Sequence, residues 1–169
     1  FPTRRSSDLI VGMHGKGNVG LAGCNDVQYQ THYALWAFLG SPLMIGCDIR
    51  EMSNETRRIL MSDEMIRINQ DPLCRQPYKV KNHAWNDNVL IYVKALANGD
   101  LAIGMFNLSD EKSRAAMNLD EIGLPFSTGR TLELTEVWTG ENLCANNASL
   151  VTELEPFASK VYRAKVVKL

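Results

Sequence analysis

The chain has 169 residues, of which 45% are hydrophobic and 22% are charged, and its formal net charge is -1. This composition is that of a globular protein, and it offers no positive excess for binding nucleic acid or an anionic membrane. The longest apolar run, residues 33–44, is interrupted by Gly40, Ser41 and Pro42. It is therefore too short to span a bilayer.

The four cysteines are scattered along the chain and form no recognisable framework. They are too sparse for a disulfide scaffold, and they show neither a CxxC pair nor a Cys/His spacing typical of structural zinc. We therefore expect neither a metal site nor a cofactor. The cysteines are Cys24, Cys47, Cys74 and Cys144.

The first eight residues are expected to be foreign to the protein. Residues 1–9 read Phe-Pro-Thr-Arg-Arg-Ser-Ser-Asp-Leu, and this string corresponds codon by codon to a translated short-read sequencing adapter. The segment has no apolar centre, so it is not a secretory signal. The alternative, a natural N-terminal tail, does not account for a match through every codon. We assign residues 1–8 to the adapter, give Asp8 no role, and expect the natural protein to extend upstream.

Residues 9–47 predict a strand, a helix and a second strand. The short apolar runs at residues 9–13 and 43–47 are typical of strands that are buried on both faces of a parallel sheet. Between them, Asn25 or Asp26 can cap a helix whose apolar residues recur at helical spacing. The intervening glycine-rich loop lacks the spacing of a phosphate-binding motif.

A second helical stretch follows the second predicted strand. It starts at Ser53 or Asn54, is broken near Ser62, and is ended by Asp71-Pro72, because the residue before a proline is disfavoured in a helix. Strands that alternate with helices over short links predict a parallel α/β fold. Two such strands bury too little surface to stand alone, so we expect further strands beside them.

After residue 76 the helical periodicity gives way to short strands. Asn98-Gly99 lies between two of them and predicts a two-residue hairpin turn, in which both central residues take positive φ. Strands at this spacing are typical of an antiparallel sandwich. We therefore expect one unit at residues 9–76 and a second at residues 77–169. The predicted strands cover residues 78–81, 89–95, 101–107, 114–119, 131–138, 150–154 and 160–167.

His14 and Asp48 are the candidate substrate-binding residues, although the signal for each is weak. Each follows the carboxyl end of a predicted strand, and in a β/α barrel that end is the active face. The alternatives are a hydrogen-bonded surface role for His14 and, for Asp48, a structural role that binds backbone N–H groups or Arg50. We favour the structural roles. No complete catalytic constellation is present, so we expect no catalytic residue in the chain.

Three segments resemble the α-galactosidases (melibiases) of glycoside hydrolase family 27. They are residues 33–37 (Tyr-Ala-Leu-Trp-Ala), 41–50 (Ser-Pro-Leu-Met-Ile-Gly-Cys-Asp-Ile-Arg) and 68–73 (Ile-Asn-Gln-Asp-Pro-Leu). Two later segments, Asn-Gly-Asp-Leu-Ala-Ile-Gly-Met-Phe-Asn and Glu-Val-Trp-Thr-Gly, are similar to a hairpin and a late strand of the same family. The resemblance covers residues 10–169 and is densest before residue 77. Cys74 departs from it, because the family usually has glycine there.

The resemblance implies the last two βα units of a (β/α)8 TIM barrel followed by a C-terminal antiparallel β-sandwich. Residues 9–13 and 43–47 would be the seventh and eighth barrel strands. It also implies removal of terminal α-linked galactose from oligosaccharides with retention, through one aspartate that attacks the anomeric carbon and a second that acts as acid and then base. Both aspartates would lie upstream. The implied partner is an α-galactoside, with no cofactor, nucleic acid or membrane.

Two alternatives remain open at this stage. The substrate can differ within the family, as in an α-N-acetylgalactosaminidase, a β-L-arabinopyranosidase or an α-glucan hydrolase. Alternatively, residues 77–169 can be a non-catalytic carbohydrate-binding sandwich, which requires exposed aromatic side chains. The aromatic residues of that region mostly fall at strand positions that a core would claim, which argues against the second alternative. They are Tyr78, Trp85, Tyr92, Trp138 and Tyr162.

Overall fold

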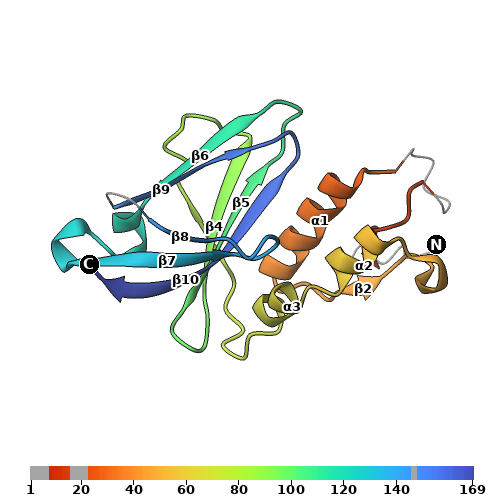
Figure 1. The fold of residues 1–169 in the computed structure, drawn as a ribbon, viewed down its shortest axis with the longest axis horizontal. Coiled ribbons are helices and arrows are strands. Elements are labelled where there is room, and N and C mark those ends of the chain that lie inside the picture. Colours follow the sequence, from red (N-terminus) through yellow and green to blue (C-terminus); the bar gives the residue numbers. More distant parts are fainter. Residues whose placement is uncertain (1–7, 16–22, 146–147) are drawn as a thin grey trace.

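The computed structural model describes residues 8–15, 23–145 and 148–169. Residues 1–7, which hold most of the expected adapter segment, and residues 16–22 of the glycine-rich loop lie outside the described residues. Among the helices of the described part, none combines the length and apolar character that crossing a membrane requires. An antiparallel sandwich occupies one side of the molecule and three helices gather at the other (Figure 1).

The predicted parallel pair of strands is present but short. Strand β1 (Asp8–Leu9) pairs in parallel with β2 (Met44–Ile45), and the two form a two-stranded sheet. The first strand ends early because the chain turns at once, with the Met13 N–H donating to the Ile10 carbonyl. After the second strand, Gly46 approaches β1 so closely that a Cβ there would lie 2.6 Å from the Leu9 carbonyl oxygen.

Helix α1 (Asp26–Phe38) begins at the predicted cap. The Asn25 side chain accepts a hydrogen bond from the Gln28 N–H, and the Gln28 side chain accepts one from the Asn25 N–H, which is a capping box. The helix ends before Gly40, whose φ of 64° is the left-handed conformation that glycine adopts at helix ends. Its buried residues, including Tyr29 and Tyr33, form one face.

The second helical stretch is broken where the sequence predicts. After a short 3-10 turn, η1 (Ile49–Glu51), helix α2 (Asn54–Leu60) follows the cap Ser53, and helix α3 (Asp63–Asn69) follows Ser62. The Ser53 hydroxyl accepts from the Thr56 N–H at 3.0 Å. The two short helices together place Ile59, Met65 and Ile68 in the core beneath α1.

Eight strands form two antiparallel sheets in the second half of the chain. The larger sheet has the order β3-β4-β5-β10-β7-β8, and β6 pairs with β9 in a second sheet. All seven predicted strands are present, whereas β8 is too short to be predicted from alternation. The strands are β3 (Tyr78–Val80), β4 (Val89–Ala95), β5 (Leu101–Asn107), β6 (Ser113–Asn118), β7 (Arg130–Glu136), β8 (Asn142–Cys144), β9 (Ser149–Leu154) and β10 (Ser159–Lys168).

The β4–β5 hairpin is confirmed, but its predicted turn type is wrong. Only Gly99 takes positive φ, at 87°, and its N–H donates to the Leu96 carbonyl. The Leu96 N–H donates to the Asp100 carbonyl, so the loop has three residues rather than two. This is the type I turn with a following left-handed glycine, which needs only one residue at positive φ.

Two hydrophobic cores lie on opposite faces of the larger sheet. The first is enclosed between this sheet and β6–β9, and all of its buried members lie between Val80 and Ala164. The second lies between the sheet and the helices, where Ala102, Phe106 and Val161 of the sheet meet α1. Gly104 makes room for this contact, since a Cβ there would lie 2.6 Å from the Phe106 ring and 3.0 Å from Phe38.

Polar side chains fasten α3 and the segment after it to the sheet. The Lys94 ammonium of β4 is buried and donates to the Ile68 carbonyl near the end of α3, at 2.7 Å. Burial lowers the pKa of Lys94, and the nearby carboxylate of Asp71 partly opposes that effect. The Asp71 carboxylate in turn accepts the Ala97 N–H of the hairpin. The predicted helix stop therefore also attaches the hairpin.

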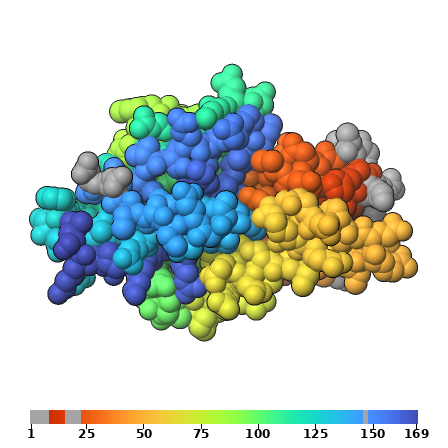
Figure 2. Space-filling view, in the orientation of Figure 1, coloured from red at the N-terminus to blue at the C-terminus, as the bar shows by residue number. Residues whose placement is uncertain are grey.

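An ion-pair network makes a second polar connection between the helices and the sheet. Arg163 of β10 donates to Glu64 of α3 at 2.9 Å and to Asp100 of the hairpin at 3.0 Å. The Arg163 guanidinium thus joins the first turn of α3 to the β4–β5 hairpin. Figure 2 shows the helices, in orange and yellow, packed directly against the sandwich.

Candidate functional site

His14 lies just beyond the carboxyl end of β1 and is held by helix α1. Its backbone N–H donates to the Tyr29 hydroxyl at 2.7 Å, and its ring meets the Tyr29 ring edge-on at 5.2 Å. Its Nε2 lies 4.0 Å from the Asp26 carboxylate, and its side chain is 45% exposed. These contacts give His14 a packing role, and its φ of 45° belongs to the tight turn.

Asp48 lies beyond the carboxyl end of β2 and organises its own loop. Its carboxylate caps η1 by accepting the Arg50 N–H at 3.0 Å, and it also accepts the Arg50 guanidinium at 2.9 and 2.6 Å. The hydrogen bonds to Asp48 raise the pKa of Arg50. Because both side chains are exposed, this pair adds little stability. Asp48 thus contacts the backbone and the side chain of Arg50 within one loop.

The two loops come together at Gly46, whose missing Cβ leaves space beside Leu9 and Met13. Cys47 lies between Gly46 and Asp48, and burial raises the pKa of its thiol, which disfavours the reactive thiolate. Among the residues that the structure describes, no group of three or more His, Cys, Asp or Glu side chains could hold a metal ion. The candidate polar side chains beyond β1 and β2 are those of His14 and Asp48, and each contacts residues of its own surroundings.

Cys74 lies in a backbone conformation that favours glycine. Its φ is 49°, in the left-handed region where glycine is favoured, and its N–H donates to the Asp71 carbonyl. The turn between α3 and β3 thus keeps the conformation that glycine would adopt. All four cysteines are free thiols.

The Glu-Val-Trp-Thr-Gly segment has a structural explanation. The Glu136 carboxylate, which is buried, accepts the N–H groups of Trp138 and Thr139 at 3.0 and 2.7 Å and the Thr139 hydroxyl at 2.8 Å. Gly140 closes the turn at a φ of 74°. The Arg58 guanidinium of α2 lies 5.5 Å from the centre of the Trp138 ring. This segment therefore shapes the contact between the sandwich and the helices.

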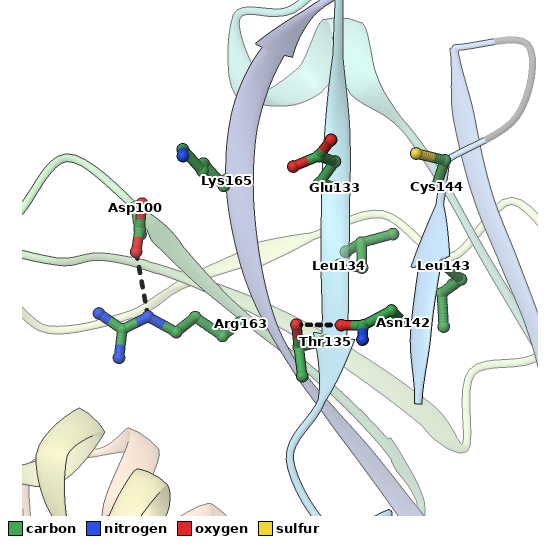
Figure 3. A pocket seen from close by; sticks show the side chains of 9 residues that line it. All are labelled: Asp100, Glu133, Leu134, Thr135, Asn142, Leu143, Cys144, Arg163 and Lys165. Atoms are coloured by element: carbon green, nitrogen blue, oxygen red, sulfur yellow. Dashed lines mark hydrogen bonds and ion pairs between the residues drawn. The ribbon is translucent and has the colours of Figure 1, made fainter. Parts of the chain in front are cut away.

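A groove of about 580 Å³, lined by both polar and apolar side chains, lies on the larger sheet, where strands β10, β7 and β8 run side by side (Figure 3). Register aligns Lys165, Glu133 and Cys144 in one row across the strands, and Arg163, Thr135 and Asn142 in the next. The Thr135 hydroxyl donates to Asn142 at 2.7 Å. Sequence reasoning missed this groove, because the rows depend on pairing between strands far apart in the chain.

Comparison with known proteins places two family models on the chain. The model described as "Alpha galactosidase A" matches residues 8–71, and the model described as "Alpha galactosidase C-terminal beta sandwich domain" matches residues 86–164. An α-galactosidase of Oryza sativa subsp. japonica is 31% identical over 145 residues, which is 85% of this chain and 33% of that protein. The chain spans about a third of the length of the curated relatives it matches.

Solved structures of related proteins have a similar fold. A candidate α-galactosidase/melibiase from Bacteroides fragilis is 31% identical with a TM-score of 0.79, and the match covers 94% of this chain and 33% of that one. A β-L-arabinopyranosidase of glycoside hydrolase family 27 from Geobacillus stearothermophilus shares the fold, with a TM-score of 0.75 at 21% identity, over 95% of this chain and 36% of that one.

Proposed function

Because the chain belongs to the α-galactosidase (melibiase) family, glycoside hydrolase family 27, we propose that it is part of a retaining glycosidase that removes terminal α-linked galactose from oligosaccharides. Retaining hydrolysis needs one carboxylate that attacks the anomeric carbon and a second carboxyl group that protonates the leaving oxygen and then activates water. In this proposal both are aspartates that precede residue 9 in the complete protein, and the chain by itself is inactive.

The proposal assigns residues 9–76 to the last two βα units of a (β/α)8 barrel and residues 77–169 to the C-terminal sandwich. The parallel pairing of β1 with β2 and the intervening helix α1 support the first assignment. The self-contained core between the two antiparallel sheets supports the second. In this proposal residues 1–8 derive from the adapter, and the backbone of Asp8 pairs with that of Met44.

One observation carries the proposal. A parallel strand pair with its helices and an antiparallel sandwich follow one another in a single chain, at the residues where the two family models match. The polar groups beyond β1 and β2 are consistent with a supporting role at such an edge, because His14 and Asp48 are both engaged in local contacts. We propose no direct contact of either residue with the reacting atoms.

The experiment that tests the proposal starts from the source gene. Sequence upstream of the Leu9 codon should continue in frame through earlier barrel strands that carry two aspartates. The complete enzyme should release p-nitrophenol from its α-galactoside with retained anomeric configuration, as followed by proton NMR. The 169-residue chain should release none. Turnover by the purified 169-residue chain, or an upstream frame without the aspartates, would contradict the proposal.

The sugar specificity is tested with the same complete enzyme. We propose α-galactose, and the alternatives are the α-N-acetylgalactosaminide, the β-L-arabinopyranoside and an α-glucan. A side-by-side comparison of kcat/KM on the p-nitrophenyl derivatives of the three monosaccharides and on a starch oligosaccharide separates them. A higher kcat/KM on any of the other substrates than on the α-galactoside would reassign the activity within the family.

A further inference from the structure

Trp85 is the most exposed large hydrophobic side chain in the described part of the chain, at 89%. It belongs to the loop between β3 and β4, and this loop runs next to β6 in Figure 1. Trp85 is an exception to the expectation that a core would contain most aromatic side chains of this region, and its φ of 58° is left-handed rather than extended. An exposed tryptophan lacks the stabilisation that burial of its ring would give, and its ring is available to a ligand.

Side-chain amides hold the loop around Trp85 in place. The Asn82 Nδ2 group donates to the carbonyls of Asn86 and Arg114, at 3.1 and 3.3 Å. Its Oδ1 accepts the N–H groups of Ala84 and Ala116, at 3.1 and 2.9 Å. One asparagine therefore joins both sides of the loop to strand β6.

A second asparagine and a backbone bond complete this support. The Asn86 Nδ2 group donates to the Ser113 hydroxyl at 2.9 Å, and its Oδ1 accepts the Asn88 N–H at 2.9 Å. The His83 N–H donates to the Ala116 carbonyl at 2.8 Å. Left-handed backbone at a bulky residue persists only where its surroundings enforce it, and such positions cluster at binding sites. The loop is therefore held to strand β6 on both sides of Trp85.

A cation lies beside the presented ring. The Lys81 ammonium is 5.5 Å from the centre of the Trp85 ring, within the range of a cation–π contact. This contact steadies the ring and places hydrogen-bond donors next to it. Except for Ala84, which is half-buried, the other residues of the loop are polar or charged. They are Asn82, His83, Asn86, Asp87 and Asn88. The surface is thus one aromatic plane within a polar surround, which differs from the packed apolar centre of a protein interface.

We propose that Trp85 and Lys81 form a non-catalytic binding site for galactose residues of a branched polysaccharide. The axial hydroxyl of galactose leaves several C–H groups together on one face of the ring, and this apolar face can stack on the indole while Lys81 donates to a hydroxyl at the ring edge. The choice of galactose among pyranoses rests on the proposed function. The loop is well separated from β2 in Figure 1, so a polymer held there leaves the β1–β2 edge open.

Affinity electrophoresis of the full 169-residue chain tests this site. Galactomannan in a native gel should retard the chain, whereas unsubstituted mannan should not. Trp85→Ala should weaken the apparent affinity by about tenfold or more, a loss of the size expected for one aromatic stacking contact. Trp85→Phe should retain part of the binding. Phe126→Ala is the matched control. Phe126 is also an exposed aromatic residue, at 69%, but it lies in the 3-10 turn η3 (Phe126–Thr128). The gel should retard this variant as much as the parent chain.

Three results would overturn the site. The first is that galactomannan does not retard the parent chain, and the second is that it retards the parent chain and Trp85→Ala equally. The third is that size exclusion shows a dimer for the parent chain and a monomer for Trp85→Ala, because the Trp85 ring would then bind a second copy of the chain. Equal retardation in unsubstituted mannan would overturn the choice of galactose. Binding requires no turnover, so these results are independent of the upstream aspartates that decide the proposed function.

Discussion

The sandwich and the helical part of the molecule differ in how they obtain a core. Every buried residue of the sandwich core lies between Val80 and Ala164. The core beneath the helices instead includes Leu96, Ala102, Phe106 and Val161, which the strands and hairpin of the sandwich supply. The residues of the sandwich alone therefore form its core, whereas the core of the helical part also includes side chains from the outer face of the larger sheet.

The strands differ in the same way. In the sandwich, β5 and β10 each have a hydrogen-bonded neighbour on both sides. In the helical part, β1 and β2 pair only with each other within the described residues, so each leaves one edge without a strand partner. We therefore expect the sandwich to fold without the helices, and the helical part to require the sandwich for its core.

Separating the two regions should produce the largest effect. Residues 77–169 expressed alone should unfold cooperatively in urea, because their core is complete. Residues 8–76 expressed alone should show no cooperative transition, because they lose the sheet face against which α1 packs. Circular dichroism of the two pieces makes the comparison. Cooperative unfolding of residues 8–76 alone would break the account.

Phe106→Ala tests, at a single side chain, how much the contact between the sandwich and the helices contributes to stability. Phe106 is fully buried and meets Phe38 of α1 at 5.7 Å between ring centres. Its truncation should lower the free energy of unfolding of the whole chain by about 3–5 kcal/mol. In isolated residues 77–169, where Phe38 is absent, the cost should be much smaller. Urea titration of all four proteins gives the two differences.

Met117→Ala is the matched control for the Phe106 measurement. Met117 is fully buried in the core between the two sheets. Its truncation should cost about 2–5 kcal/mol both in the whole chain and in isolated residues 77–169. Equal costs for Phe106→Ala in the two contexts would show that Phe106 does not depend on the helices.

Lys94→Met tests the polar attachment of α3. The substitution preserves the buried stem but removes the donor to the Ile68 carbonyl, and an unsatisfied buried acceptor costs about 1–3 kcal/mol. The whole chain should lose stability by that amount in urea titration. Isolated residues 77–169 should lose none, because the carbonyl partner is absent there. A loss of the same size in both would place the role of Lys94 inside the sandwich.

Tyr33→Phe gives the smallest effect and a pH dependence. The Tyr33 hydroxyl donates to the Leu60 carbonyl at 3.1 Å, so its removal should cost about 1 kcal/mol at pH 7. Burial raises the pKa of Tyr33 from 10.0 to about 12. Because the folded-state pKa is the higher one, the contribution of the neutral phenol is complete below pH 10 and is lost as the pH rises toward 12.

Urea titrations of the parent chain and Tyr33→Phe between pH 7 and 11 isolate this contribution. The difference in stability between the two proteins should fall above pH 10, since only the parent chain carries the Tyr33 phenol. A difference that stays constant to pH 11 would mean that Tyr33 is accessible to solvent in the folded chain.

Sequence patterns predicted the elements that are determined by alternation of apolar residues or by a helix cap. The bounds of β4 and β5 agree with the predicted strands, and the capping box at Asn25 marks the start of α1. Strand β8 escaped prediction because three residues are too few to show alternation. Strand β1 is shorter than predicted because Gly12, at a φ of 77°, begins the turn within the apolar run.

The candidate site was harder to predict because it depends on tertiary contacts. The described contacts of His14 and Asp48 are with neighbours such as Tyr29 and Arg50, of which only Arg50 could be named from the sequence. The exposure of Trp85 was not predicted, because a sequence pattern cannot reveal a left-handed residue in a loop. The rows of the groove on β7 depend on register with β8 and β10.

Native-state hydrogen exchange of the full chain tests most directly whether the helical part depends on the sandwich. In low urea, amides of β4, β5 and β10 should exchange only through global unfolding, while those of α1, α2 and α3 should exchange through a separate opening of lower free energy. Uniform protection across both regions, with one common dependence on urea, would contradict the account, because the two regions would then unfold as a single unit.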